Sequence, residues 1–407
     1  MPLYPLFLSI VLYGLLSHPA PPSVRWVEAA VGCLLLAVTG VRRPASLLSG
    51  HAAAVAGDGW TCAMALSFLW LAWAPLLRGL SLGWDGVMRD VVPLGFLFLP
   101  LMLVPPLRAH RARAVRILVA ALALAGVLFA VRWWNQNGWA FGLVGGVPLG
   151  DGPRYFLNAP SVLFAGIGLT LAGAGALAGR MRGGGPAAVA GLAGGLLCLG
   201  ALAGAVHRLA LVLAVCALTW AAVRQARGLV LAAAAAALLA LMVEGSLPAA
   251  LAQAWEKSRI YGVNARGAEL DAVLVQAGDG PWPLLFGQGW GALLANPAVG
   301  GWRVGYTHTL VSYALFKAGI LGLAALTVYL LGALRAVPGL VRRHPVLAAA
   351  VLPPLAVSLT LHTSFKYLDC GLLLTLLVLA GEDEGKAPVT APRTAVPPSC
   401  RPSAAPP

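Results

Sequence analysis

The 407-residue chain is 59% hydrophobic, only 10% of its residues are charged, and its formal net charge is +14. Soluble globular proteins carry roughly 25% charged residues, so this composition excludes an ordinary soluble domain and indicates a protein with many membrane spans. Basic loops between the apolar runs account for most of the positive charge, which therefore does not indicate a nucleic-acid partner.

The apolar runs predict membrane-spanning helices, because each can cross about 30 Å of hydrocarbon. We expect an all-α polytopic membrane helix bundle of about twelve transmembrane helices, in which abundant Gly and Ala allow close packing. The predicted spans lie near residues 3–17, 25–41, 60–77, 87–106, 114–132, 159–178, 186–205, 208–223, 228–245, 307–334, 345–362 and 369–381. Residues 1–381 then form one integral membrane domain, and residues 382–407, rich in Pro, Ala and Ser, form a disordered cytoplasmic tail.

Basic residues set the expected orientation, because Lys and Arg are retained on the cytoplasmic side. With the N-terminus inside, every predicted inner loop is basic: Arg42 and Arg43; Arg108, Arg111, Arg113 and Arg116; Arg180 and Arg182; Arg224 and Arg227; and Arg335, Arg342 and Arg343. Both termini are then cytoplasmic, and two excursions, 133–158 and the larger 246–306, lie outside. The larger excursion contains two helical stretches, 249–262 and 265–278, and precedes the tenth span as a small helical cap.

One arginine on the predicted outer side lies at the first position of a membrane span. Arg208 follows His207 at the start of the eighth predicted helix. An arginine at membrane depth is costly unless its head reaches the interface or finds an anion. Because a guanidinium binds phosphate oxygens through two parallel hydrogen bonds, we interpret Arg208 as a pyrophosphate ligand, with simple contact to the interface as the alternative.

Further arginines lie in the large outer excursion. Arg266 is on the second predicted helical stretch, three residues before Glu269, so these two could form an ordinary surface pair. Arg259 lies seven residues earlier and faces the same side if the helix is continuous, although Gly262 interrupts it. We expect one of the two arginines to contact substrate and favour Arg266.

His308 is the residue that we expect to carry the chemistry. It follows Thr307, a predicted N-cap of the helix 308–334, at the outer interface. A histidine there could act as a general base near neutral pH. The alternative is an interfacial histidine hydrogen-bonded to a loop carbonyl, and the neighbouring cationic loop favours the catalytic interpretation.

The remaining polar residues give weaker signals. Arg89 and Asp90 could form an internal ion pair, while Arg154, Arg303 and the Lys366 to Asp369 segment could line the outer rim. The histidines and cysteines show no metal-ligand spacing, and no phosphate-binding glycine loop, GxSxG or DxD motif is present, so we expect no metal and no cofactor.

Four segments in order resemble the O-antigen ligase and polymerase superfamily. They are HRLALVLAV, RGAELDAVL, PLLFGQGWG, and a histidine that opens a helix continuing YALFKAGILGLAAL. The resemblance covers most of the chain in topology but only about residues 200–335 in motif. The matching positions are Pro283, Leu284, Gly287, Gly289, His308, Gly319, Ile320 and Gly322. Two positions depart from the pattern, since Thr309 replaces the usual Asn and His207 replaces a common Ser.

The resemblance implies a metal-independent glycosyltransferase in the bacterial inner membrane, with its active site on the periplasmic face. The donor would be a glycan on undecaprenyl pyrophosphate, and the acceptor would be lipid A-core. Arg208, Arg266 and Arg259 would hold the pyrophosphate while His308 deprotonates the acceptor hydroxyl. Additional substrate contacts are expected from Arg154, Arg89, Arg303, Lys366 and His207.

Several alternatives remain open at this stage. We favour the ligase over the polymerase because family ligases often have this length and one large loop before the histidine, whereas the polymerase often carries two prominent loops. A related protein O-oligosaccharyltransferase typically has an additional C-terminal region. From another class, a secondary transporter for an anionic solute would also use outward arginines, and helices broken near the middle of the membrane would favour it.

Overall fold

The structure of the chain, a computed structural model, describes residues 3–19, 25–139, 154–177, 179, 185–205, 207–224, 265–360 and 363–382. The predicted ninth span and the first helical stretch of the outer excursion lie outside these ranges. The elements in chain order are α1 (Leu3–Leu16), α2 (Trp26–Thr39), α3 (Arg42–Leu48), α4 (His51–Ala54), α5 (Gly59–Gly79), η1 (Leu80–Leu82), α6 (Trp84–Leu97), α7 (Leu99–Arg108), α8 (Arg111–Gln136), η2 (Arg154–Asn158), α9 (Pro160–Leu177), α10 (Gly185–Gly204), α11 (Arg208–Arg224), α14 (Ala265–Ala277), α15 (Pro281–Phe286), β1 (Leu294–Asn296), η3 (Pro297–Val299), β2 (Trp302–Val304), α16 (Leu310–Leu334), α17 (Val337–Arg343), α18 (Pro345–Thr360), η4 (Thr363–Lys366) and α19 (Leu368–Gly381).

Helices dominate the described part of the chain, as the sequence predicted. The one sheet found there is a two-stranded antiparallel hairpin, in which Ala295 of β1 lies opposite Arg303 of β2. This hairpin was not expected. It leads the chain from α14 and α15, called here the cap, back to the start of α16.

Six helices of the described part are long and apolar enough to cross a membrane, and the number rises to seven if the bent pair α2 and α3 is one span. Four more apolar helical segments are shorter, within α1, α11, α18 and α19. The membrane character is therefore confirmed, while the predicted count of twelve is not. The predicted span 87–106 is divided into α6 and α7 at Phe98.

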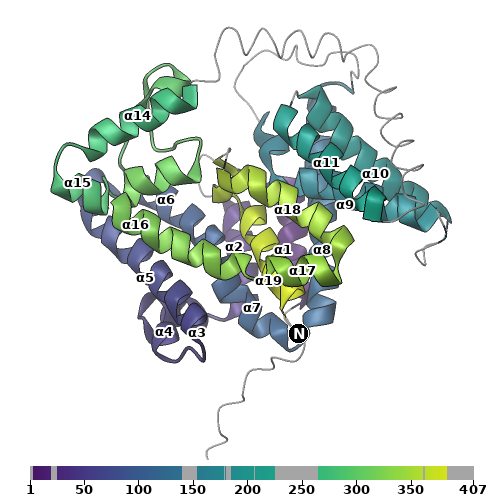
Figure 1. Cartoon of the computed structure of the whole chain (residues 1–407), viewed down its shortest axis with the longest axis horizontal. Coiled ribbons are helices and arrows are strands. Elements are labelled where there is room, and N and C mark those ends of the chain that lie inside the picture. Colours follow the sequence, from purple (N-terminus) through teal and green to yellow (C-terminus); the bar gives the residue numbers. More distant parts are fainter. Residues whose placement is uncertain are drawn as a thin grey trace, which may run out of the picture.

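The helices form two groups joined by a central one (Figure 1). Helices α5, α6 and α16 carry α14 and α15 on one side, α9, α10 and α11 lie on the other, and α1, α8, α18 and α19 lie between them. Small residues permit the closest packing. A Cβ at Gly173 of α9 would lie 2.6 Å from the Leu192 nitrogen of α10, so only glycine fits there.

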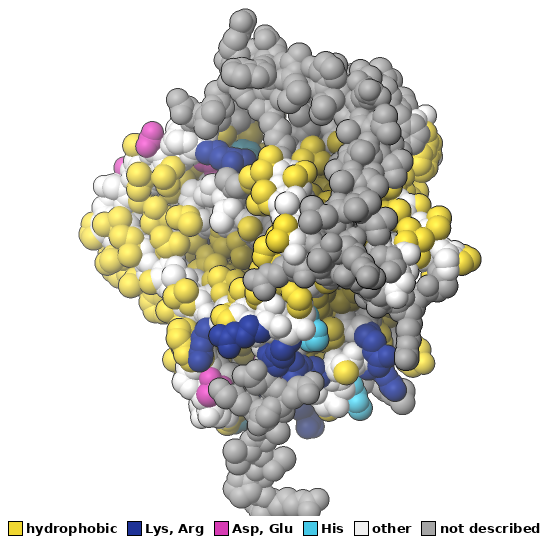
Figure 2. Space-filling model, turned by 45° about the vertical axis from the view of Figure 1, so that its right-hand side comes forward, with side chains coloured by type: hydrophobic (Ala, Val, Ile, Leu, Met, Phe, Trp, Pro, Cys, Tyr) yellow, Lys and Arg dark blue, Asp and Glu magenta, His cyan; other side chains and the backbone are white. Residues whose placement is uncertain are grey.

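Basic side chains gather in a band near the end of the molecule opposite α14 (Figure 2), where Figure 1 places α3, α7 and α17. Three of them bind the C-terminal end of α19. Arg108 forms an ion pair with Glu382, and Arg111 and Arg343 donate to backbone carbonyls at the helix end. Glu382, the first residue of the predicted tail, is thus anchored to the bundle, whereas residues 383–407 lie outside the described ranges.

Helix α16 is broken at Gly319, where φ is 68° and ψ is −167°. The segment Gly287–Gly291, called here the GQGWG segment, lies against this break. The backbone N–H groups of Gln288 and Gly289 donate to the carbonyls of Phe316 and Lys317, at 2.8 and 3.0 Å. The segment therefore supplies hydrogen-bond donors for carbonyls that the broken helix leaves without helical partners.

The GQGWG segment approaches its neighbours so closely that its glycines have no room for side chains. A Cβ at Gly287 would lie 2.4 Å from the Ala318 nitrogen, and one at Gly79 of α5 would lie 2.3 Å from the Trp290 carbonyl oxygen. The Trp290 indole is buried and donates to the Leu71 carbonyl at 3.2 Å. The segment, which directly follows α15, thus ties α5 and α16 to the cap.

Candidate active site

His308 is held by a buried carboxylate from helix α14 of the cap. Glu269 of α14 has one oxygen 2.6 Å from the backbone nitrogen of His308 and its other oxygen 2.6 Å from Nδ1 of the ring. The Glu269 side chain is 1% exposed and that of His308 is 30% exposed. An ionised carboxylate can only accept, so this contact favours a proton on Nδ1, and in the neutral ring Nε2 is then the hydrogen-bond acceptor. One edge of the imidazole is fixed while the ring as a whole stays accessible.

Helix α14 presents Glu269 to His308 because of its buried face. Glu269 and Val273, four residues apart, lie on the same side of the helix and are both buried. Arg266 and Asp271 are exposed. The sequence suggested a surface ion pair between Arg266 and Glu269. Within the described part of the structure these two residues do not form it, because Glu269 binds His308 instead. Arg266 is therefore left at the exposed start of α14.

The start of α16 differs from the sequence prediction. The helix begins at Leu310, and its N-cap is Thr309, whose hydroxyl accepts from the Ser312 backbone nitrogen at 3.1 Å. Thr307, the predicted cap, is fully buried and its hydroxyl accepts from the Ser312 hydroxyl at 3.0 Å. His308 thus lies just before the helix, and the residue that departs from the family pattern, Thr309, performs the capping.

A second polar centre lies between α6, α16 and η4. Asp90 of α6 is 2.6 Å from Nζ of Lys317 and 3.5 Å from Nζ of Lys366. It also accepts from the Tyr313 hydroxyl at 3.0 Å and from the Gly291 backbone nitrogen at 2.9 Å. We call Arg89, Asp90, Tyr313, Lys317 and Lys366 the Asp90 cluster. The ion pair predicted between Arg89 and Asp90 is replaced by these two lysine contacts.

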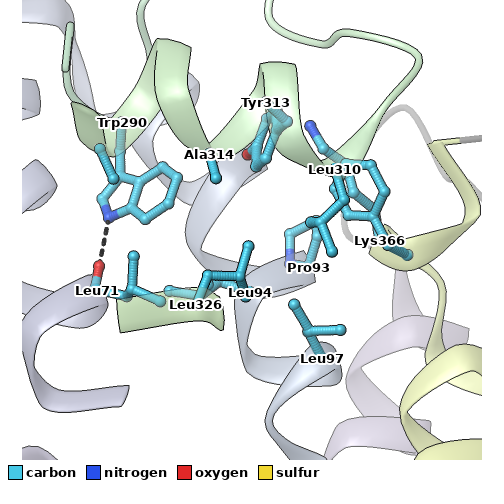
Figure 3. Close-up of a pocket in the computed structure, with 12 residues that line it drawn as sticks. Leu71, Pro93, Leu94, Leu97, Trp290, Leu310, Tyr313, Ala314, Leu326 and Lys366 are labelled. Atoms are coloured by element: carbon cyan, nitrogen blue, oxygen red, sulfur yellow. Dashed lines mark hydrogen bonds between the residues drawn. The ribbon is translucent and has the colours of Figure 1, made fainter. Parts of the chain in front are cut away.

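Lys366 lies at one end of a small, otherwise apolar cavity of about 20 Å³, lined by Leu71, Leu94 and Trp290 among others (Figure 3). Its ammonium lies 3.9 Å from the centroid of the Tyr313 ring, an attractive arrangement between a cation and an aromatic face. Burial lowers the pKa of Lys366 to about 8. The side chain of Lys366 is 14% exposed and Asp369 is fully buried, so neither residue lies openly on the surface.

Arg89 connects the Asp90 cluster to the His308 site. Its side chain is exposed and lies over Gly305, where a Cβ would come within 2.8 Å of the guanidinium Nη2. Gly305 is only three residues before His308. The arginine is also close enough for its positive charge to contribute to the lowered pKa of Lys366.

The other predicted site residues are placed less completely. Arg303 is exposed on β2, and His207 lies between α10 and α11. Arg208 begins α11, which packs against α18, and Arg154 begins η2, but their side chains lie outside the described part. Arg259 lies outside the described residues altogether. Of the predicted set, the structure therefore brings Arg89 near Lys366 and places Arg89 over Gly305, three residues before His308. A cavity shared by His308 and Arg208 stays a prediction.

Two contributors to this region were not singled out from the sequence. Lys317 is one charge within an apolar run, and Glu269 is separated from His308 by 39 positions, so no local spacing marks either role. No protein-family model matches the chain, and a search of curated proteins found no match.

Proposed function

We propose that this chain is a lipid-linked oligosaccharide glycosyltransferase of the O-antigen ligase type, acting on the periplasmic face of the bacterial inner membrane. It would transfer the O-antigen glycan from undecaprenyl pyrophosphate to lipid A-core and so complete lipopolysaccharide. The observation that carries the proposal is the pair of 2.6 Å contacts by which Glu269 fixes His308.

The pair supplies what a general base for a hydroxyl acceptor requires. A carboxylate that holds Nδ1–H fixes both the tautomer and the orientation of the ring, which leaves Nε2 to take a proton. The acceptor oxygen would attack the anomeric carbon as its proton passes to Nε2 of His308. The bond between that carbon and the pyrophosphate oxygen would break, and its electron pair would stay with the departing phosphate.

Cationic side chains would stabilise the charge that develops on the leaving group. Arg266 begins the helix that carries Glu269, and Arg89 lies over the backbone three residues before His308. Arg208 and Arg259 are added on the strength of the sequence resemblance. Such preorganised cations are the usual way to lower the barrier for loss of a phosphate leaving group. The polymerase of the same superfamily would use the same groups with another lipid-linked repeat as acceptor.

One observation favours a second candidate, a secondary transporter for an anionic solute. Helix α16 is broken at Gly319, and the buried charges of Asp90 and Lys317 lie beside the break. Discontinuous helices near buried charges are typical of transporter binding sites. The Glu269 to His308 pair has no role in that candidate, and for this reason we favour the transferase.

A reconstituted assay separates the candidates. Purified protein in lipid vesicles is given lipid-linked glycan with or without lipid A-core, and the release of undecaprenyl pyrophosphate is followed. The transferase predicts release that depends on the acceptor, and loss of that release in His308→Ala with expression unchanged. Uptake of an anionic solute without cleavage of a glycosidic bond, or full transfer by His308→Ala, would refute the proposal.

A further inference from the structure

We infer that the Asp90 cluster is a second anion site, in which Lys366 and Arg89 bind a phosphate group. The inference deepens the proposed function and depends on it for the physiological source of that phosphate. The binding chemistry itself is argued from contacts in the described part of the structure.

The first step is the balance of charge. Two lysines, Lys317 and Lys366, face a single carboxylate, Asp90, and among the described residues no second carboxylate forms an ion pair with them. The exposed Arg89 adds a third positive charge close enough to lower the pKa of Lys366. The cluster is therefore strongly cationic in a largely apolar setting. Buried charges are stable only when they are paired, so a surplus of this sign calls for an anion.

The second step is the unequal use of the two lysines. Lys317 is fully buried, 2.6 Å from Asp90, and also donates to the Ala292 carbonyl at 2.6 Å. Lys366 is 3.5 Å from Asp90, retains 14% exposure of its side chain, and rests over the Tyr313 ring. Asp90 and Lys317 thus form the internal frame, while Lys366 keeps donor capacity for a ligand.

The third step is the position of Arg89. Its exposed guanidinium comes from the residue before Asp90 and lies over Gly305, which offers no side chain to cover it. A lysine ammonium supplies a compact charge and an arginine supplies a planar fork of donors, a combination suited to a tetrahedral oxyanion. The cluster thereby adds a phosphate contact beside the His308 site that is independent of Arg208 and Arg266.

Binding of inorganic pyrophosphate tests the inference without any turnover. Full-length protein in nanodiscs of zwitterionic phosphatidylcholine is titrated by calorimetry at constant ionic strength. We expect Lys366→Gln and Arg89→Gln each to weaken binding by about tenfold or more, because each removes a charged donor. Arg342→Gln, which removes an exposed arginine from α17 in the basic band at the other end, should bind like the unchanged protein.

The Arg89 variant protects the test against misfolding. Lys366→Gln removes a contact to the buried Asp90, whereas Arg89 is exposed, so Arg89→Gln decides the question even if the first variant fails to fold. Lys366→Arg, which preserves the charge, should retain binding. Wild-type affinity in both glutamine variants would overturn the inference.

A second lipid composition identifies the source of the phosphate. If anionic phosphatidylglycerol in the nanodisc weakens pyrophosphate binding to the unchanged protein but not to Lys366→Gln, the site takes a lipid headgroup phosphate. If it does not, the site takes the phosphate of the donor substrate or of a free solute. If transfer depends on the acceptor but neither glutamine substitution affects pyrophosphate binding, this inference alone is refuted. If pyrophosphate binds as expected but no transfer occurs, the proposed function is refuted.

Discussion

Replacement of Glu269 by glutamine tests whether the carboxylate positions His308 for catalysis. The glutamine can still accept from the backbone nitrogen of His308, but its amide group then faces Nδ1, which must become an acceptor. The ring proton moves to Nε2, the atom that should receive the acceptor proton. A general base contributes about 10²–10⁴-fold to rate, so we expect kcat to fall by about that factor, equivalent to about 3–5 kcal/mol in the barrier.

The expected loss of stability is smaller than the loss of rate. A hydrogen bond to a charged group contributes about 1.5–3 kcal/mol, and the substitution keeps both hydrogen bonds while replacing the charged carboxylate by a neutral amide. The assay is single-turnover release of undecaprenyl pyrophosphate, with the thermal unfolding midpoint measured in parallel. Asp271→Asn is the matched control, because it makes the same chemical change at an exposed position of the same helix and should leave kcat unchanged.

The KM for the acceptor gives a readout that a merely structural role would not produce. A positioning role predicts a reduced kcat with little change in that KM and an intact fold. If Glu269→Gln transfers glycan within about threefold of the unchanged protein while His308→Ala is inactive, the carboxylate does not set the tautomer and the argument from the two contacts fails.

Two further predictions follow from the same region. The affinity for pyrophosphate should decrease as pH rises through about 8, because burial lowers the pKa of Lys366 to about 8 and its charge is lost above that value. Lys366→Arg should move this decrease to higher pH. An affinity of the unchanged protein that does not vary with pH would contradict the prediction. Gly319→Ala should destabilise the fold by more than about 3 kcal/mol, since φ is +68° and the new Cβ would lie 2.4 Å from the Leu285 carbonyl carbon. Thermal unfolding in detergent measures this, with Gly267→Ala, whose Cβ meets nothing within 4 Å, as a control that should be neutral or stabilising; equal midpoints for the two variants would contradict the steric argument.

The helical, membrane-embedded architecture could be predicted from the sequence because hydropathy is a local property. The stretch 265–278 was predicted as a helix and forms α14, and the predicted span 307–334 contains α16. The break inside α16 could not be predicted, because its cause is a segment about thirty positions earlier that donates to its carbonyls. The glycines of that segment and Gly319 were visible in the sequence, and their shared lack of side chains was the available signal for close approach.

The candidate site was predictable in its residue types but not in its pairings. His308 was singled out by its place at a helix start beside the cationic loop, yet the partner considered for Glu269 was Arg266, three residues away, because local spacing is all that a single sequence offers. For Asp90 the partner considered was its neighbour Arg89, and Asp90 instead contacts two lysines from α16 and η4. In both cases the tertiary fold brings a distant partner closer than the adjacent one.

The close contact between the GQGWG segment and the break in α16 has a consequence for protein engineering. Exchange of the α14–α15 cap with that of another protein needs the GQGWG segment and the broken helix α16 to come from one parent. A graft that begins at Ala265 and ends after Gly319 would transplant the interlocking glycines as a unit. A graft that ends between Gly291 and Leu310 would join a foreign GQGWG segment to a resident helix whose break was shaped for another backbone.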